Sequence, residues 1–271
     1  MTSLVEVRRL ILALIGVGFI FAPLYYMMIL GLMDVTEMYQ TPPPLFPQNP
    51  TILPYLKAWK TLAPSLLNSA IIAGGSMILT ILLSTPAAFA VAKMRFRWKP
   101  HLSAFLIIMQ ILPYIALVIP LFLLFNYLNL LNTYLGVILA ITTVYSPFCV
   151  ILLIPYMRSL PTPLLEAAAI DGASSFQIFW RIVLPLSRPA LATASLLIFL
   201  LGWGNFIFPL ALIQSENLMP ATILLNKFID IYTIEWNAVM AGALILSLPP
   251  MIIVLLARKA LTAVAVGGIK Q

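Results

Sequence analysis

The sequence predicts an all-α integral membrane protein with six transmembrane helices. Of its 271 residues, 62% are hydrophobic and only 8% are charged, and the mean hydropathy is +1.07. Soluble domains are roughly half apolar and a quarter charged. All 23 charged residues lie outside a set of apolar runs. Because a helical span needs about 20 residues, these runs occupy most of the chain and leave no room for a separate soluble domain.

The six apolar runs cover residues 10–33, 66–92, 102–124, 134–157, 190–215 and 238–257. Backbone polar groups in lipid need internal hydrogen-bond partners, and the runs lack the alternation of a β-barrel, so each should be a helix. The first run follows Arg8 and Arg9, but its 24 residues exceed a signal-peptide core of about 7–15 and no A-x-A-like cleavage site follows, which predicts a retained anchor. The uncharged stretch 102–157 is too long for one span, so it should form a hairpin.

Basic residues are distributed unevenly between the two sides of this topology. Three lie on one side, Lys57, Lys60 and Lys227. Twelve lie on the other, Arg8, Arg9, Lys93, Arg95, Arg97, Lys99, Arg158, Arg181, Arg188, Arg258, Lys259 and Lys270. Lys and Arg near span ends stay preferentially in the cytoplasm, so both termini should be cytoplasmic. The positive charge therefore indicates a lipid bilayer as the partner and no nucleic acid.

The cytoplasmic segment 158–189 contains the pattern of a short helix. Thr162 followed by Pro163 predicts a helix N-terminus, with Thr162 as the cap. Glu166 should lie near the positive end of the helix dipole. The helix should continue for about two turns to Asp171, and Gly172 should end it in a conformation with φ > 0.

A second helix should follow in the same segment. Ser174 with Gln177 three residues later predicts a capping box. The helix should lie at the membrane interface and should be halted by Pro185, which has no N–H to donate. A thin alanine-rich helix held between two spans fits a groove on another protein, and a packed turn with no partner is the alternative.

Seven residues of this segment follow a spaced motif: EAA (Glu166, Ala167, Ala168), three residues, Gly172, nine residues, Ile182, one residue, Leu184 and Pro185. The motif resembles the EAA loop of binding-protein-dependent ABC importer permeases. The chain also resembles the carbohydrate-importing, maltose-type branch along most of its length, in LFPQNPTILPYLKAW at 45–59, AAFAVAKMRF at 87–96, residues 120–139 and GGIK at 267–270.

The resemblance implies a type I ABC importer permease fold in the cell membrane and a subunit that forms half of a sugar translocation path. It implies an ABC ATPase dimer, a second permease, commonly a different chain, and an extracytoplasmic sugar-binding protein. The sequence has no G-x-x-x-x-G-K-[ST] loop, so ATP and Mg should bind the separate ATPase, and this chain should be no enzyme and hold no cofactor. The residues expected to couple to the ATPase are Glu166, Ala167, Ala168, Asp171, Gly172, Ala173, Ile182, Leu184 and Pro185.

Polar and aromatic residues within the spans are candidates for the substrate path, because polar groups in a span usually face the interior. The candidates are Gln110, Tyr114, Tyr145, Trp203 and Asn205. Their hydroxyl and amide groups and ring faces suit a neutral polyol, whereas interhelical hydrogen bonding and packing are the alternative. Where the maltose-type branch often reads W-N-[DE]-F, this chain reads W-G-N-F from Trp203.

Other classes of membrane protein fit the sequence less well. A secondary transporter should have Asp, Glu, Lys, Arg or His inside its spans for ion coupling, and the runs lack these residues. A membrane enzyme needs converging acids, nucleophiles or metal ligands, whereas Asp34 and Glu37 form the one close external carboxylate pair and should solvate a loop. One cysteine, Cys149, and one histidine, His101, predict no disulfide and no metal site. Only the EAA motif separates the chain from a purely structural subunit.

Overall fold

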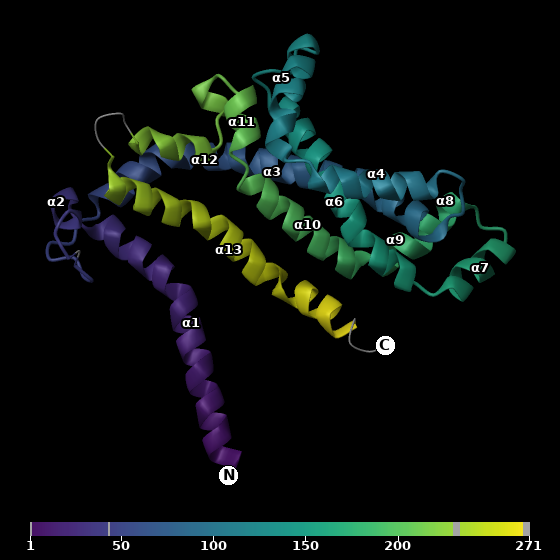
Figure 1. Cartoon of the computed structure of the whole chain (residues 1–271), viewed down its shortest axis with the longest axis horizontal. Coiled ribbons are helices and arrows are strands. Elements are labelled where there is room, and N and C mark those ends of the chain that lie inside the picture. Colours follow the sequence, from purple (N-terminus) through teal and green to yellow (C-terminus); the bar gives the residue numbers. More distant parts are fainter. Residues whose placement is uncertain (1, 43, 230–233, 268–271) are drawn as a thin grey trace. The chain divides into compact units, whose positions relative to one another are not determined.

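The computed structural model of the chain is helical (Figure 1). It describes the backbone of residues 2–42, 44–229 and 234–267 and the side chains of residues 6–42, 44–229 and 234–257. Helices account for 81% of the structure. Within the described ranges β-structure is limited to one isolated bridge between Ile229 and Ile234. The predicted all-α class is confirmed, and residues 268–270 of the GGIK segment lie outside the described residues.

The α-helices follow one another along the whole chain. They are α1 (Thr2–Leu32), α2 (Val35–Met38), α3 (Leu53–Lys93), α4 (Lys99–Ile111), α5 (Val118–Tyr127), α6 (Tyr134–Ser159), α7 (Thr162–Ile170), α8 (Ser175–Ile178), α9 (Leu184–Leu186), α10 (Arg188–Trp203), α11 (Ile207–Leu212), α12 (Ala221–Leu224) and α13 (Trp236–Gly267). Short non-α turns lie between them: η1 (Tyr114–Leu117), the π-helical η2 (Phe179–Val183), η3 (Glu216–Leu218) and η4 (Leu225–Phe228).

Four helices in the described part of the chain are long and apolar enough to cross a membrane: Glu6–Leu32, Leu53–Lys93, Tyr134–Ser159 and Trp236–Ala257. Two bent pairs also qualify, Lys99–Ile111 with Tyr114–Tyr127, bent by 99°, and Ser175–Leu186 with Arg188–Trp203, bent by 76°. Counting each pair as one span gives six. The chain is therefore a multi-pass membrane protein, and the division of its residues among six spans stays a prediction.

The predicted single helix over 102–124 is wrong at its centre. α4 ends at Ile111, and Leu112 is extended, with φ −67° and ψ 127°. The residue before a proline is disfavoured in the α region, and Pro113 has no N–H with which to continue the helix. The chain resumes as η1 and then α5 after a 99° bend, which places Tyr114 at the bend.

Residues 67–220 and 250–271 form one compact unit. It contains two hydrophobic clusters, one around Leu153, Met157 and Ile198 and the other around Ile141 and Phe208. α6 connects the two clusters, because it contributes residues to both. Its first part packs with α5 and α11 in one cluster, and its last part lies in the other cluster and leads into α7. Within this unit, α7 and α8 therefore lie at one end and α5 and α11 at the other (Figure 1).

Residues 1–66 and 221–249 form the second compact unit. Long-range contacts hold it together: the Asn237 amide donates to the Met33 carbonyl at 3.2 Å, and Lys57 forms a partly exposed salt bridge with Glu235 at 2.6 Å. The expectation that Glu37 solvates a loop is wrong. Its buried carboxylate accepts hydrogen bonds from the backbone N–H groups of residues 48 and 49 at 3.2 and 2.8 Å, which folds the proline-rich loop back onto α2.

Candidate functional site: the loop after α6 and a polar cavity

α7 ends in a Schellman turn at the predicted glycine. The Gly172 N–H donates to the Ala169 carbonyl at 3.1 Å, and the Ala173 N–H donates to the Ala168 carbonyl at 2.9 Å. Gly172 has φ +82°, which costs other residues on the order of 1–3 kcal/mol. A Cβ built at Gly172 would meet no atom within 4 Å. The predicted helix end is confirmed, and its requirement for glycine is conformational rather than steric.

The start of α7 differs from the prediction. Thr162 is the first residue of the helix rather than its cap, and Pro161 precedes it without a side-chain cap. The Thr162 hydroxyl instead accepts a hydrogen bond from the Lys93 ammonium at 3.2 Å. Lys93, at the end of α3, also donates to the carbonyl oxygens of Arg158 at 3.0 Å and Leu160 at 2.6 Å. A cation from a distant helix therefore holds this N-terminus, and local sequence patterns do not reveal such a contact.

The second helix of the loop is capped as predicted but ends elsewhere. The Gln177 N–H donates to Ser174 Oγ at 3.3 Å, and the Ser174 N–H donates to Gln177 Oε1 at 2.8 Å, which confirms the capping box. The expectation that Pro185 halts the helix is wrong. α8 continues through η2 into α9, and the chain bends at Ser187. Pro185 lies in the first turn of α9, directly after a π-helical turn that alters the hydrogen-bond register, so its missing N–H is tolerated.

The nine residues predicted for coupling differ in exposure. Five are exposed: Glu166, Ala167, Asp171, Gly172 and Pro185. Four are partly buried, with three packed against the chain's own hydrophobic cluster and one lining an apolar groove: Ala168, Ala173, Ile182 and Leu184. The motif therefore has two parts. Its partly buried residues pack the segment against the rest of the chain, and its exposed residues leave one side of α7 uncovered.

Ile170, which belongs to none of the predicted sites, lies on the exposed surface of α7. Its side chain is 86% exposed, whereas that of Leu165 on the same helix is only 9% exposed and packs in the core. Ile170 lies four residues after Glu166, so the two side chains are neighbours on the helix surface. The four-residue spacing from Glu166 is the feature of the sequence that could have identified Ile170 as part of the same surface. α7 therefore presents a carboxylate, alanines and an uncovered isoleucine together.

Three of the five predicted path residues, Tyr114, Tyr145 and Asn205, line one cavity of about 360 Å³. The rest of its wall comes from the end of α10 and from residues 204–207. Among the described residues that line it there is no Asp, Glu, Lys, Arg or His. The cavity thus offers hydroxyl, amide and aromatic groups without formal charge, which suits a neutral ligand with many hydroxyl groups.

Asn205 reaches this cavity because the fifth apolar run breaks there. The expected continuous helix over 190–215 is wrong, since α10 ends at Trp203 and α11 begins at Ile207. Asn205 is buried, and its Oδ1 accepts a hydrogen bond from the Phe208 N–H at 3.2 Å, which satisfies one donor in the first turn of α11. Tyr145 of α6 lines the same cavity. Asn205 therefore supports the break as well as lining the cavity.

The other two predicted path residues do not line this cavity. Trp203 is 7% exposed, and its ring stacks on Phe199 with centroids 5.8 Å apart and planes at 28°. Gln110 is exposed on α4, before the bend at Pro113. The cavity is thus formed by the residues at the two helix breaks and by α6.

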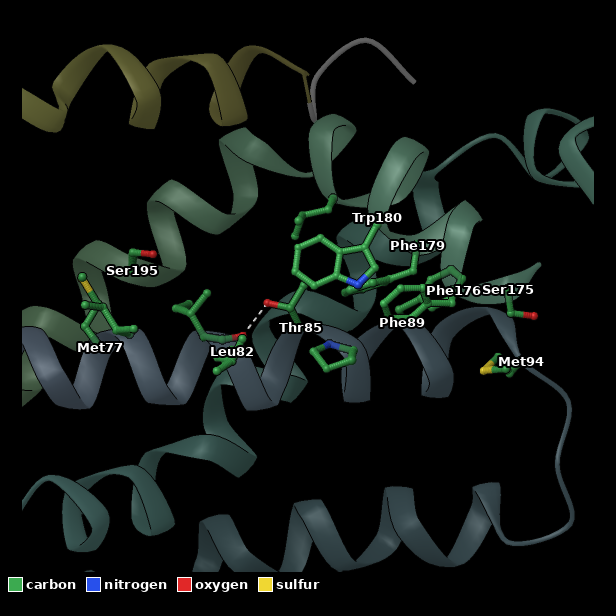
Figure 2. Close-up of a pocket in the computed structure, with 14 residues that line it drawn as sticks. Met77, Leu82, Thr85, Phe89, Met94, Ser175, Phe176, Phe179, Trp180 and Ser195 are labelled. Carbon is green, nitrogen blue, oxygen red and sulfur yellow. Dashed lines mark hydrogen bonds between the residues drawn. The ribbon is translucent and has the colours of Figure 1, made fainter. Parts of the chain in front are cut away.

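A larger apolar groove of about 670 Å³ lies beside the segment 158–189 (Figure 2). Thr85 and Phe89 of α3 line it together with Phe179 and Trp180 of η2, and the rings of Phe89 and Phe179 are 5.6 Å apart. The Thr85 hydroxyl is engaged within α3, where it donates to the Ile81 carbonyl at 2.6 Å. Burying sugar hydroxyls against such a surface would leave them without partners. The smaller polar cavity is therefore the better candidate for a sugar path.

Apolar helices, a capped loop that presents a short helix, and an uncharged polar cavity between broken helices together define a multi-pass membrane transport permease. The chain belongs to the family described as the binding-protein-dependent transport system inner membrane component, whose model matches residues 81–263. This range contains the EAA motif, α7 and all the cavity residues, and the predicted family is confirmed.

Two named relatives agree with this assignment, and a solved structure has the same fold. The sulfoquinovosyl glycerol transport system permease protein of Agrobacterium fabrum is 29% identical over 252 residues, which cover 92% of this chain and 88% of that protein. A probable ABC transporter permease protein of Pyrococcus horikoshii is 34% identical over 192 residues, covering 71% and 70%. A chain from the crystal structure of a bacterial ABC transporter involved in alginate import shares the fold, with a TM-score of 0.77, 23% identity and coverage of 95% and 96%.

Proposed function

We propose that this chain is one permease subunit of an ATP-driven sugar importer in the cytoplasmic, or inner, membrane. It forms half of the translocation path and couples to a cytoplasmic ATPase through α7. The observation that supports this most directly is the construction of α7. Its buried face is anchored by Leu165 in the core, its end is fixed by the Gly172 turn, and its other face is uncovered.

The exposed side of α7 has the properties of a docking helix. Ala167 and Ala169 keep its surface thin, so that a groove on a partner could approach the backbone closely. Ile170 supplies an apolar anchor, and Glu166 and Asp171 supply charged hydrogen-bond acceptors. The proposed binding site for α7 is a groove on one subunit of an ABC ATPase dimer. That dimer also holds the ATP and Mg that this chain is not expected to bind.

The proposed cargo is a neutral sugar, and its proposed site is the cavity lined by Tyr114, Tyr145 and Asn205. A relative from Rhizobium radiobacter, 29% identical over 203 residues, is named as a lactose transport system permease protein. A second permease, commonly a different chain in this branch, would complete the path, and an external sugar-binding protein would deliver the cargo.

Cross-linking in the assembled transporter tests this proposal. Single cysteines at Ala167 and Gln214, both exposed positions, are introduced into affinity-tagged chain in its native membrane. We expect Ala167→Cys to cross-link to an ATPase subunit and Gln214→Cys to fail to do so. The purified complex is then screened with lactose and other neutral sugars, and one of them should stimulate ATP hydrolysis in the presence of the binding protein. A complex that lacks an ATPase, or a cross-link from position 214 instead, would contradict the assignment.

A further inference from the structure

The end of α3 is tied to the start of α7 by a single side chain. We propose that Lys93 is a positioning residue that locks these two helices together, so that a displacement of α7 carries α3 with it. This inference rests on the proposed coupling role of α7. It goes further because it names the residue through which that movement reaches the membrane-spanning part of the chain.

All the donor capacity of the Lys93 ammonium is used on one short segment. An ammonium group has three N–H donors, and its three acceptors are the carbonyl oxygens of Arg158 and Leu160, at 3.0 and 2.6 Å, and the hydroxyl of Thr162, at 3.2 Å. Arg158 lies in the last turn of α6, Leu160 is its C-cap residue, and Thr162 begins α7. Lys93 therefore binds the whole connection between α6 and α7.

Electrostatics favour this arrangement. The C-terminal end of α6 leaves carbonyl groups without intrahelical donors and carries the negative end of the helix dipole, so a cation is stabilised there. Hydrogen bonds from a charged donor are also roughly twice as strong as neutral ones. Since all three donors are bonded to acceptors of the protein, the role of Lys93 goes beyond adding positive charge to the cytoplasmic surface.

The connection between α6 and α7 is also fixed from its other side. Leu160 is buried, and Leu165, in the second turn of α7, packs in the same hydrophobic cluster. The backbone between them cannot shift away from Lys93 without uncovering these side chains. The core and the ammonium therefore hold residues 158–162 between them.

α3 provides a route from this connection to the cavity. About 20 residues before Lys93, which is roughly 30 Å along an α-helix, α3 comes into close contact with α10. A Cβ built at Gly202 would lie 3.1 Å from the Cα of Ala73. Gly202 lies two residues before the break at residues 204–206 that brings Asn205 to the cavity wall. A displacement of α3 would therefore be felt where the cavity is formed.

Distance measurements between spin labels in the assembled importer test the lock. In a Cys149→Ala background, labels are placed on α3 at Leu83 and on α7 at Leu164, both exposed, and distances are recorded without nucleotide and with a non-hydrolysable ATP analogue plus Mg. The parent should give one narrow distribution in both states. Lys93→Met keeps the aliphatic stem but removes the donors, so its distribution should broaden and shift with nucleotide. Lys93→Arg restores a charged donor group and should restore the narrow distribution.

The matched control is Lys99→Met, because Lys99 donates only locally, to the Met94 carbonyl at 3.3 Å. This control should behave as the parent does. Once a sugar is identified, Lys93→Met should also lower uptake per ATP hydrolysed by about tenfold, within the range typical of coupling between two sites. If Lys93→Met does not assemble, Lys93→Gln, which keeps only a neutral amide donor, is measured instead and should give a distribution broader than that of the parent.

Different results would overturn the lock and the proposed function. A narrow, nucleotide-independent distribution in Lys93→Met or Lys93→Gln, within a complex that contains the ATPase, would contradict the lock alone. Broadening that Lys93→Arg fails to reverse would also contradict it, since the charged donor would then not be the cause. A parent chain that purifies without any ATPase would instead contradict the proposed function.

Discussion

Gly202 and Gly204 lie two residues apart at the end of α10, but an added methyl group would meet different surroundings at each. At Gly202 it would lie 3.1 Å from the Ala73 Cα, whereas at Gly204 it would meet only the Leu200 carbonyl oxygen, at 3.5 Å. Gly204 also has φ −80° and ψ −1°, which other residues adopt readily. The close helix approach therefore depends on Gly202, which sequence analysis did not single out.

We predict that Gly202→Ala destabilises the purified complex, because overpacking of this kind costs roughly 1–3 kcal/mol. Gly204→Ala should change stability by less than about 0.5 kcal/mol. Thermal unfolding of the two variants, compared with the parent, checks both values. Equal melting temperatures for the two variants would show that α3 and α10 can separate without cost.

Asn205 combines a structural contact with a place in the cavity wall, and two substitutions separate these roles. Asn205→Leu removes the acceptor for the Phe208 N–H, so the melting temperature should fall by the equivalent of about 0.5–2 kcal/mol. Asn205→Ser keeps an oxygen that can cap the same N–H, so much of this loss should be recovered. If the amide binds sugar, both variants should reduce uptake at limiting sugar about tenfold, the effect of losing one hydrogen bond of about 1.4 kcal/mol.

Uptake and stability are measured on the same preparations of these two variants. Tyr145→Ala and Leu210→Ala provide comparison positions, because Tyr145 lines the cavity and Leu210 is an exposed residue of α11. Uptake that falls only where the melting temperature falls would mean that Asn205 acts through packing alone. Uptake that stays normal in both variants would remove Asn205 from the substrate path.

At the scale of elements, the Gly172 turn sets the orientation of α7 through its backbone conformation. Because there is room for a side chain at Gly172, the cost of a substitution should follow its tolerance of φ > 0. We predict that Gly172→Val impairs ATPase coupling, with a conformational penalty on the order of 1–3 kcal/mol. Gly172→Asn should retain most activity, because asparagine adopts this conformation several-fold more readily.

The measurement for this pair is sugar-stimulated ATP hydrolysis by the assembled complex, together with the amount of ATPase that co-purifies. The two variants differ little in side-chain size, so steric interference with the ATPase would affect both. Equal impairment of Gly172→Val and Gly172→Asn would therefore show that the partner, and not the turn, requires glycine at this position.

Local patterns predicted those helix ends that depend on neighbouring residues. The capping box of Ser174 and Gln177 and the Schellman turn at Gly172 each involve groups within five residues of one another, and both were found from the sequence. The cap assigned to Thr162 was wrong because the donor to its hydroxyl is Lys93, 69 residues away. Such a contact depends on how α3, α6 and α7 pack, which no local pattern records.

The helix breaks show the same limit. Apolar composition located the third and fifth runs but could not show that they are interrupted, because hydropathy does not distinguish a straight helix from a bent one. Pro113 provided a signal for the first break, although proline also occurs in α6 without ending it. The second break is stabilised by the contact of Asn205 with Phe208. Three of the five path residues came together in one cavity because they lie at these breaks or face them.

At the scale of the whole molecule, charge distribution predicts which side of the membrane each loop occupies. The inner side carries a predicted net charge of +9 and the outer side −2. Basic residues near span ends resist translocation, so this asymmetry favours one orientation. In the predicted orientation, α7 and its exposed face would lie in the compartment that contains ATP. The proposed coupling role therefore depends on this orientation.

We predict that single cysteines at Gln48 and Gln214 react with a membrane-impermeant thiol reagent added to intact cells and that one at Ser174 does not. All three positions are exposed, so a difference in labelling reports the side of the membrane rather than burial. Cys149 is fully buried, and a Cys149→Ala background removes any contribution from it. Ser174→Cys should become reactive once the membrane is permeabilised, which serves as the control for its exposure. Labelling of position 174 in intact cells would place α7 outside, where it could reach no cytoplasmic ATPase.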